Sequence, residues 1–175
     1  VRAAPLPSPI NHARSSDLLR LWQRDCTSGS LHWPEGLKPW HFALRLGSPG
    51  SRDFIWVEIG SSIARLLDQV RLGEPARIAS NPFEQCILQR FFGTVLRRSA
   101  PGLVRLIADG AGPKGTSLPI ECLLLPGETG TLHAAMLPFT SESHEPTAAI
   151  NLRLTGIWPF LSLQSGALSA KFTSH

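Results

Sequence analysis

Cysteine is scarce in this chain and is not arranged for disulfide bonding. The three cysteines, Cys26, Cys86 and Cys122, are far apart and odd in number, and no CxxC pair occurs. This excludes a small secreted domain held together by disulfides, and it is typical of a protein in a reducing compartment. We expect each cysteine to be a small buried apolar residue rather than a reactive thiol.

Long uninterrupted hydrophobic runs are also absent. The N-terminal residues Val1–Pro5 lack the apolar core of a signal peptide. The most apolar stretch, Ala148–Ala170, is interrupted by Arg153, Pro159 and other breaks, so it is not expected to cross a bilayer. We therefore expect a soluble, cytoplasmic protein without a membrane span.

Basic residues are only slightly in excess and do not form a run. The 17 Lys and Arg outnumber the 13 Asp and Glu, which gives a formal net charge of +4. Arg97 and Arg98 are the tightest basic pair, and no basic run is interleaved with aromatic residues, so we expect no nucleic-acid partner. A hydrophobic content of 42% over 175 residues is enough for one globular domain with a core.

No familiar catalytic or nucleotide-binding motif is present. HExxH and GxSxG are missing, and none of the six histidines is paired at metal-ligand spacing. Residues 110–115 match GxGxxG, but a strand-like run follows and Pro113 removes a backbone amide, so a hairpin turn is the better interpretation. We expect a protein that is not an enzyme and binds no metal or nucleotide stoichiometrically. The sequence does not identify a cofactor.

Four ionisable residues lie inside apolar, strand-like runs: His41, His133, Glu58 and Glu121. The two histidines alternate with apolar residues, so we expect them to face solvent. His133 lies in a central-looking strand and is the better functional candidate. Glu58 and Glu121 each stand alone among apolar neighbours, and no pair of catalytic carboxylates is evident.

The order of the apolar runs is the main positive signal. Two strands come first, a helical middle follows, and three strands close the core. Turn-rich residues at 110–115 and 126–130 suit hairpins, so the last three strands should form an antiparallel meander. The predicted strands are Trp40–Leu46, Phe54–Ile59, Leu103–Asp109, Leu118–Leu125 and Thr131–Phe139.

The best-marked helix is predicted at Asn81–Arg98. Asn81 is a favourable N-cap, Pro82 suits the first helical position, and Glu84 follows three residues after the cap. We expect the apolar stripe to pack on the sheet and the opposite side to face solvent. The stripe consists of Ile87, Leu88, Phe91, Phe92, Val95 and Leu96; the opposite side consists of Gln85, Gln89, Arg90, Gly93 and Arg97.

These patterns resemble a PAS-type sensory domain family common in alphaproteobacteria. The likeness covers about Asp17–Thr140 and rests on diffuse patterns rather than sharp motifs. They are Leu18-Leu19-Arg20-Leu21-Trp22, Ile63-Ala64-Arg65-Leu66-Leu67-Asp68, Leu88-Gln89-Arg90-Phe91-Phe92 and Cys122-Leu123-Leu124-Leu125-Pro126. The resemblance implies an α+β fold, a PAS-like five-stranded antiparallel sheet covered by helices.

The resemblance also implies a function in signal transduction. A stand-alone sensory or regulatory domain would bind a small ligand, in a pocket between helix and sheet, or a protein partner. The alternatives are a structural interaction module without ligand and a small enzyme on an α+β cone-type scaffold. The pocket candidates are Trp56, Ile87, Phe91, Phe92, Leu106, Leu124, His133 and Met136.

The segments that flank the predicted PAS-like domain, residues 15–140, have their own interpretation. Residues 1–14 are predicted to be a loose leader and residues 141–175 a tail of uncertain structure. Because Asp17–Cys26 and Ala148–Phe172 both carry large apolar residues, we expect a homodimer or a protein partner through these two segments. The alternative is that the tail folds back over the open sheet face of a monomer. The large apolar residues are Leu21, Trp22, Trp158, Phe160 and Leu161.

Overall fold

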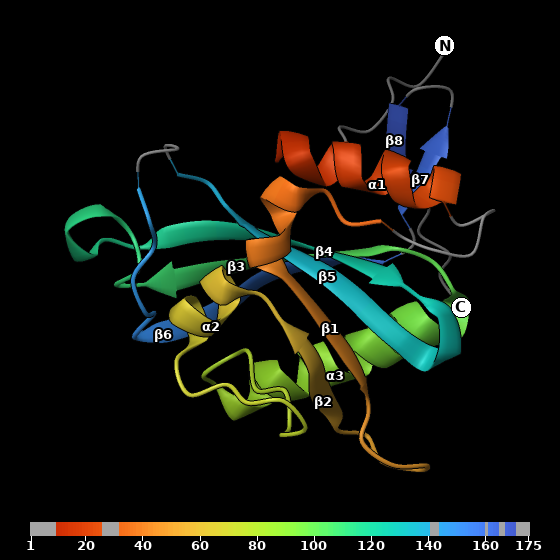
Figure 1. The fold of residues 1–175 in the computed structure, drawn as a ribbon, viewed down its shortest axis with the longest axis horizontal. Coiled ribbons are helices and arrows are strands. Elements are labelled where there is room, and N and C mark those ends of the chain that lie inside the picture. Colours follow the sequence, from red (N-terminus) through yellow and green to blue (C-terminus); the bar gives the residue numbers. More distant parts are fainter. Residues whose placement is uncertain (1–9, 26–31, 141–143, 160, 165–166, 171–175) are drawn as a thin grey trace.

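The chain forms an α+β fold with one main sheet. The computed structural model describes residues 10–25, 32–140, 144–159, 161–164 and 167–170. A six-stranded antiparallel sheet carries helix α1 on one face and helix α3 on the other (Figure 1). The predicted α+β class is confirmed, whereas the predicted count of five strands is wrong.

The elements follow one another in the order predicted, with additions at both ends. The helices are α1 (Ala13–Asp25), α2 (Ser61–Leu67) and α3 (Pro82–Arg98), with 3₁₀ turns η1 (Glu35–Trp40), η2 (Pro113–Gly115) and η3 (Glu128–Gly130). The strands are β1 (His41–Leu46), β2 (Phe54–Ile59), β3 (Gly102–Asp109), β4 (Leu118–Pro126), β5 (Thr131–Pro138), β6 (Asn151–Trp158), β7 (Leu161–Gln164) and β8 (Ala167–Ala170).

The strand order of the main sheet is β2-β1-β5-β4-β3-β6. Strand β4 pairs antiparallel with both β3 and β5, which is the predicted meander. The residues that match GxGxxG connect β3 to β4 as a hairpin, as predicted. Because a strand follows them and no long helix begins there, they do not form a dinucleotide-binding turn.

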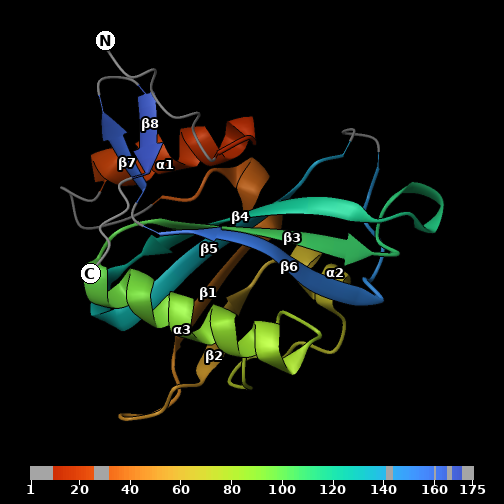
Figure 2. The same cartoon turned by 180° about the vertical axis from the view of Figure 1, so that it is seen from behind.

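The sixth strand comes from the predicted tail. Strand β6 pairs with β3 along the edge of the sheet, with Leu152 opposite Ala108 (Figure 2). Leu152 is buried and Arg153 is exposed, which is the alternation of a half-buried strand. Trp158 is half-buried and its ring lies 4.7 Å from the Arg105 guanidinium. Phe160 lies outside the described residues, as does the side chain of Leu161.

Helix α3 begins and ends where its sequence predicts. The Asn81 side chain accepts hydrogen bonds from the backbone N–H groups of Phe83 (2.8 Å) and Glu84 (3.4 Å). Ser99 closes the helix in the left-handed conformation, with φ at 46°. The buried residues of the predicted stripe are Leu88, Phe91, Phe92 and Val95, whereas Ile87 and Leu96 are half-buried.

The prediction that Gln85 and Gln89 of α3 face solvent is wrong. Gln85 accepts hydrogen bonds from the backbone N–H groups of Ile78 (2.8 Å) and Ala79 (3.0 Å). Gln85 and Gln89 both donate to the carbonyl oxygen of Ala76, at 2.7 and 3.1 Å. These backbone groups, in the segment that precedes α3, would otherwise lack hydrogen-bond partners, and the two glutamine side chains provide them. The segment is thereby held against the helix.

The second face of the sheet is covered by α1. Leu18 and Leu19 are fully buried there, and the Trp22 indole N–H donates to the carbonyl oxygen of Pro126 at 3.1 Å. The expectation that Leu21 and Trp22 form an exposed patch is wrong, since both are half-buried. The physical reason is that the second face is itself apolar and requires cover. Its buried residues are Leu103, Leu123, Leu125, Ala135 and Leu137.

A buried carboxylate joins the start of α1 to the sheet. Glu121 is fully buried and accepts hydrogen bonds from the backbone N–H groups of Asn11 (2.9 Å) and His12 (3.1 Å). The Arg105 Nε atom lies 3.7 Å from its Oε2 atom. Glu121 is therefore not alone among apolar neighbours. The predicted loose leader is packed from Ile10 onward, and its earlier residues lie outside the described ones.

Candidate ligand-binding cleft

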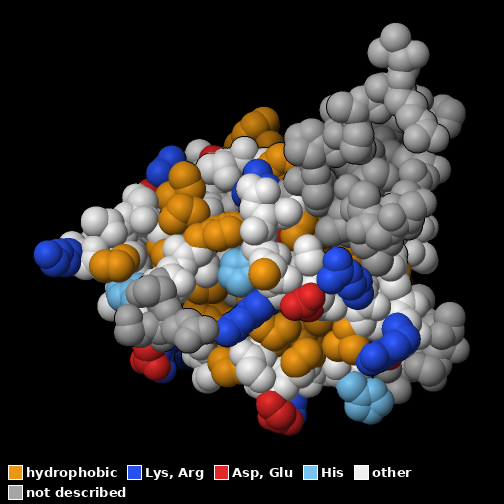
Figure 3. All heavy atoms as spheres, turned by 90° about the horizontal axis from the view of Figure 1, so that it is seen from above, with side chains coloured by type: hydrophobic (Ala, Val, Ile, Leu, Met, Phe, Trp, Pro, Cys, Tyr) orange, Lys and Arg blue, Asp and Glu red, His pale blue; other side chains and the backbone are white. Residues whose placement is uncertain are grey.

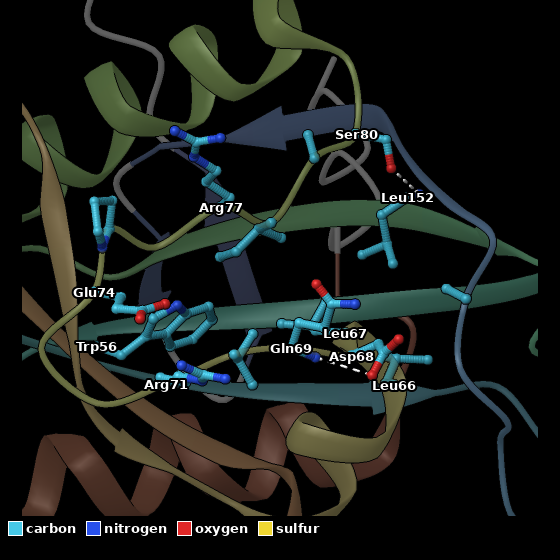
Figure 4. Close-up of a pocket in the computed structure, with 15 residues that line it drawn as sticks. Trp56, Leu66, Leu67, Asp68, Gln69, Arg71, Glu74, Arg77, Ser80 and Leu152 are labelled. Atoms are coloured by element: carbon cyan, nitrogen blue, oxygen red, sulfur yellow. Dashed lines mark hydrogen bonds between the residues drawn. The ribbon is translucent and has the colours of Figure 1, made fainter.

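A cleft of about 540 Å³ lies beside the predicted helix–sheet core. Its walls are α2, the segment 68–80 and the chain around the start of β6, and Trp56 of β2 lines its base. Figure 4 shows the side chains of these elements arranged around a common space. The cleft therefore joins segments that are far apart in the sequence.

The wall that follows α2 has an uncommon backbone. Asp68 and Gln69 are consecutive non-glycine residues with positive φ, at 46° and 55°. The Gln69 backbone N–H donates to Asp68 Oδ1 at 3.0 Å, which supports this turn. Such conformations cost roughly 1–3 kcal/mol each and concentrate at functional sites. The turn directs the chain away from α2 and opens the space that the cleft occupies.

The opposite wall is held by backbone hydrogen bonds to the edge strand β2. The Trp56 N–H donates to the Glu74 carbonyl at 3.1 Å, and the Gly73 N–H donates to the Trp56 carbonyl at 2.8 Å. The Ala76 N–H donates to the Phe54 carbonyl at 2.7 Å. This pairing also covers part of an edge strand that would otherwise present unpaired backbone groups.

The β6 side of the cleft is fixed in the same way. The Ser80 N–H donates to the Leu152 carbonyl at 3.0 Å, and the Leu152 N–H donates to Ser80 Oγ at 2.9 Å. The Ala149 N–H donates to the Leu66 carbonyl at 2.9 Å. Hydrogen bonds to β2, α2 and β6 thus fix the walls of the cleft in place.

The cleft has an apolar base and a charged rim. The rim carries both signs of charge, because Asp68, Arg71, Glu74 and Arg77 are all exposed there. In Figure 4 the Arg71 and Glu74 side chains lie near the Trp56 indole, and Arg77 lies apart from them. Such a site suits a small molecule with an apolar part and charged groups. The buried base consists of Trp56, Leu66, Ile78, Ala79 and Leu152.

The predicted pocket residues are divided by the structure. Trp56 is the one that lines the cleft. Ile87 is half-buried on α3, and His133 lies on the opposite face of the sheet, beside His41. The remaining five pack in the core between α3 and the sheet: Phe91, Phe92, Leu106, Leu124 and Met136. They are at most 5% exposed, so their own side chains fill the predicted pocket position.

The charged rim was not predicted, although the sequence carries a signal for it. From Arg65 to Arg77 a charged residue occurs at every third position, and the sign alternates. The intervening members are Asp68, Arg71 and Glu74. Gly73 and Pro75 break helical periodicity in the same stretch. A charged, helix-breaking segment next to an apolar strand is typical of a surface loop that borders a site.

A second polar cluster lies on the α1 side of the sheet. His41 is buried, and its Nε2 atom lies 3.2 Å from Nδ1 of His133. On the other side of the ring, Nδ1 of His41 lies 3.4 Å from a Glu58 carboxylate oxygen. The Trp33 ring lies over His41, with centroids 4.0 Å apart. The prediction that His41 faces solvent is therefore wrong, because Trp33 covers it.

Burial keeps both histidines neutral near pH 7. Burial, and to a lesser extent the neighbouring His133, lowers the pKa of His41 from 6.5 to about 4. Burial also lowers the pKa of His133, although Glu58 opposes this change. If His41 donates its Nδ1–H to Glu58, His133 donates Nδ1–H to His41 and retains a lone pair on Nε2. These groups are convergent, but they are not in the helix–sheet core where a PAS-like pocket was predicted.

Within the described ranges, no three or more His, Cys, Asp or Glu side chains are grouped so that they could hold a metal ion. No helix in this part of the chain has the length and apolarity that a bilayer crossing requires. None of the three comparisons with known proteins finds a match: neither a family model, nor a curated protein, nor a solved structure.

Proposed function

We propose that this chain is a PAS-like sensory or regulatory domain that binds a small ligand in the α2 cleft, the hollow of about 540 Å³ between α2, the segment 68–80 and β6. The observation that carries the proposal is this cleft with an apolar base and a charged rim. Two strands, intervening helices and then three strands in one antiparallel sheet support the PAS-like assignment. The resemblance supports it independently of the cleft.

The ligand class follows from the lining. The half-buried Leu67, Val70 and Ala149 present apolar surface to a guest above the buried base, while Arg71 and Arg77 can receive an anionic group. The proposed ligand is a small molecule with an apolar body and at least one carboxylate or phosphate. Its binding would restrain the strained turn after α2, which gives the domain a means of reporting ligand.

The alternative is an interaction module without a ligand. The observation that favours it is the filled core between α3 and the sheet, where five predicted pocket residues pack closely. The third possibility, an enzyme, would have to use the His41–His133 pair, which lies on the other face of the sheet. The α2 cleft and the His41–His133 pair are separate, so variants at one site can be tested without altering the other.

Native mass spectrometry of the full chain tests the ligand proposal. We expect the purified protein to carry a small molecule that denaturing conditions remove. Ala149→Phe should abolish this mass difference, because Ala149 lines the cleft. Ala64→Phe is the matched control, because Ala64 is exposed on α2 and does not line the cleft. Equal masses under native and denaturing conditions, together with no thermal shift by any member of a library of apolar carboxylates, would contradict the proposal.

The predicted homodimer remains a prediction. The original reason for expecting it, apolar residues left exposed on both flanking segments, no longer holds, because α1 covers the sheet and β6 extends it. Exposed apolar residues remain on β6 and before it, with Ile157 at 37% and Ile150 at 86% exposure. Light scattering on the full chain and on a chain ending at Ser143 decides the question. A monomer in both cases, with the shortened chain less stable, would favour a tail that serves only its own sheet.

A further inference from the structure

A second hollow lies along the outer side of α3. It has a volume of about 1070 Å³, roughly twice that of the α2 cleft. The β1–β2 hairpin and the segment around Pro75 form one wall, and α3 forms the other. The helix residues recur every three or four positions, so they share one face. They are Pro82, Gln85, Cys86, Gln89, Arg90, Gly93, Thr94, Leu96 and Arg97.

This α3 groove is strongly basic. Four arginines line it, from the hairpin, the segment before α3 and α3 itself, against a single acidic residue, Asp53. The arginines are Arg52, Arg77, Arg90 and Arg97. Like charges gathered in one hollow repel each other and attract an anionic partner. The charge of the groove therefore suits an anionic partner.

The charge of the α3 groove is not balanced within the described part of the chain. Elsewhere in the described ranges, Lys and Arg side chains lie within 4 Å of a carboxylate at Arg20, Arg24, Lys38, Arg65, Arg105 and Arg153. Among the four groove arginines, a side-chain hydrogen bond occurs at Arg97, and its acceptor is the neutral Thr94 hydroxyl at 3.1 Å. On the α1 side, by contrast, Figure 3 shows Lys and Arg interspersed with Asp, Glu and hydrophobic side chains.

Gly93 is a second, independent observation. Glycine in a helix interior is less favourable than alanine, by about 1 kcal/mol. A Cβ atom at Gly93 would meet one atom within 4 Å, the flexible Arg97 Nη1 at 3.2 Å. Packing inside the fold therefore does not require glycine at this position. Because Gly93 lines the groove, any side chain there would project into it, and the glycine keeps the groove open.

We propose that the α3 groove binds an acidic, partly apolar segment of a partner protein. Apolar lining residues, including Leu46 at 44% exposure, provide contact area between the arginines. The helix face from Pro82 to Arg97 is about 22 Å long at 1.5 Å per residue, which matches an extended segment of roughly seven residues. Nucleic acid is disfavoured, because Phe54 is the groove's aromatic residue and it is buried, which leaves no stacking platform.

The test uses a fluorescein-labelled ten-residue peptide of Asp, Glu and Leu, with the amide analogue in Asn, Gln and Leu as reference. Fluorescence polarisation with the full chain should show saturable binding of the acidic peptide that weakens with salt. Arg90→Gln combined with Arg97→Gln should weaken it about tenfold, the change that corresponds to 1.4 kcal/mol. Arg14→Gln combined with Arg20→Gln removes the same charge from exposed positions on α1 and should change binding less than about twofold.

Gly93→Gln tests whether binding requires the open shape of the groove and not only its net charge. It leaves the charge unchanged and favours the helix, so the melting temperature should not fall, yet peptide binding should be lost. The exposed Cys86 gives a local readout, because bound peptide should slow its alkylation in a Cys26→Ser background. An equal loss in the α1 control pair, unchanged binding in Gly93→Gln, or no saturable binding would overturn the proposal. Two other results would also overturn it. One is tighter binding of a 20-nucleotide DNA that is lost in the same variants, and the other is a dimer that Gly93→Gln dissociates.

Discussion

The two faces of the sheet are both buried, but different interactions hold them together. Under α3 the contacts are almost entirely apolar, with Phe54 and Phe92 packed edge to face at 5.6 Å between centroids. Under α1 an apolar cluster shares the face with a buried carboxylate, Glu121, and the histidine pair. The α3 face therefore depends on shape and volume, and the α1 face depends also on hydrogen bonding and pH.

The largest effect should come from the apolar face. Phe92→Ala removes a ring that is 1% exposed and leaves a cavity against the sheet, so we expect a loss of about 3–5 kcal/mol in the free energy of unfolding. Urea denaturation measures it. Phe83→Ala is the control, because Phe83 lies on the same helix and is 75% exposed. A loss below ~1 kcal/mol at Phe92 would mean that the face can relax around the missing ring.

The corresponding test of the α1 face removes its buried carboxylate. Glu121→Ala leaves the N–H groups of Asn11 and His12 without this acceptor and removes the carboxylate that lies 3.7 Å from the Arg105 guanidinium, so we expect a loss of about 3 kcal/mol. Hydrogen exchange of the Asn11 and His12 amides should accelerate. Glu128→Ala, at an exposed position, should change the stability by less than about 0.5 kcal/mol. Unchanged amide exchange would show that α1 is held by its apolar contacts alone.

A fall in pH should weaken the α1 face selectively. The unfolded chain protonates its histidines near pH 6.5, whereas the folded chain protonates His41 only near pH 4. The contribution of His41 is therefore complete above pH 6.5 and is lost as the pH falls to 4, by up to about 3 kcal/mol. The lowered pKa of His133 adds to it.

Denaturation at pH 7.5, 6.5, 5.5 and 4.5 measures this dependence. His41→Gln should flatten the decline, and His32→Gln, at an exposed histidine, should leave it unchanged. The Asp109–Arg153 pair at the surface does not interfere, because hydrogen bonds from Arg153 and Ser117 lower the pKa of Asp109 to about 2. A decline of equal slope in wild type and His41→Gln would assign the pH dependence to other groups.

The smallest effect should come from the indole that anchors α1. Trp22→Phe keeps an aromatic ring and removes the N–H that donates to the Pro126 carbonyl, so we expect a loss of about 1 kcal/mol. The matched change Trp158→Phe removes an indole that stacks on Arg105 and should cost about as much or less. A Trp22→Phe variant as stable as wild type would show that water replaces the hydrogen bond.

Local sequence signals predicted α3 well and the candidate site poorly. The cap at Asn81, the stripe through Phe92 and the hairpin at residues 110–115 depend on residues within a few positions of one another, and all are present in the structure. The cleft combines Trp56 with Leu152 and a turn in between, and no periodic pattern encodes such a combination.

The same distinction explains the corrections. The environments of Gln85 and Cys86 on α3 depend on which segment lies against the helix. Helical periodicity predicted Gln85 in solvent, whereas it bonds the segment before α3. The usual burial of cysteine predicted Cys86 in the core, whereas it is exposed. His41 was placed in solvent because alternation identifies two faces of a strand but not the cover on the second face.

The α+β class, the five strands β1 to β5, the meander and the helix that covers one apolar face were all predictable from the sequence. These follow from alternation, helical periodicity, caps and turns, which act over a few residues. The tertiary structure alone decided that β6 joins the edge of the sheet, that α1 covers the second face and that His41 meets His133. The partners in these contacts are 92 residues apart for the histidines and 110 for Asn11 and Glu121. Each apolar or polar group accepts many such partners, and only the packing of the whole chain selects one.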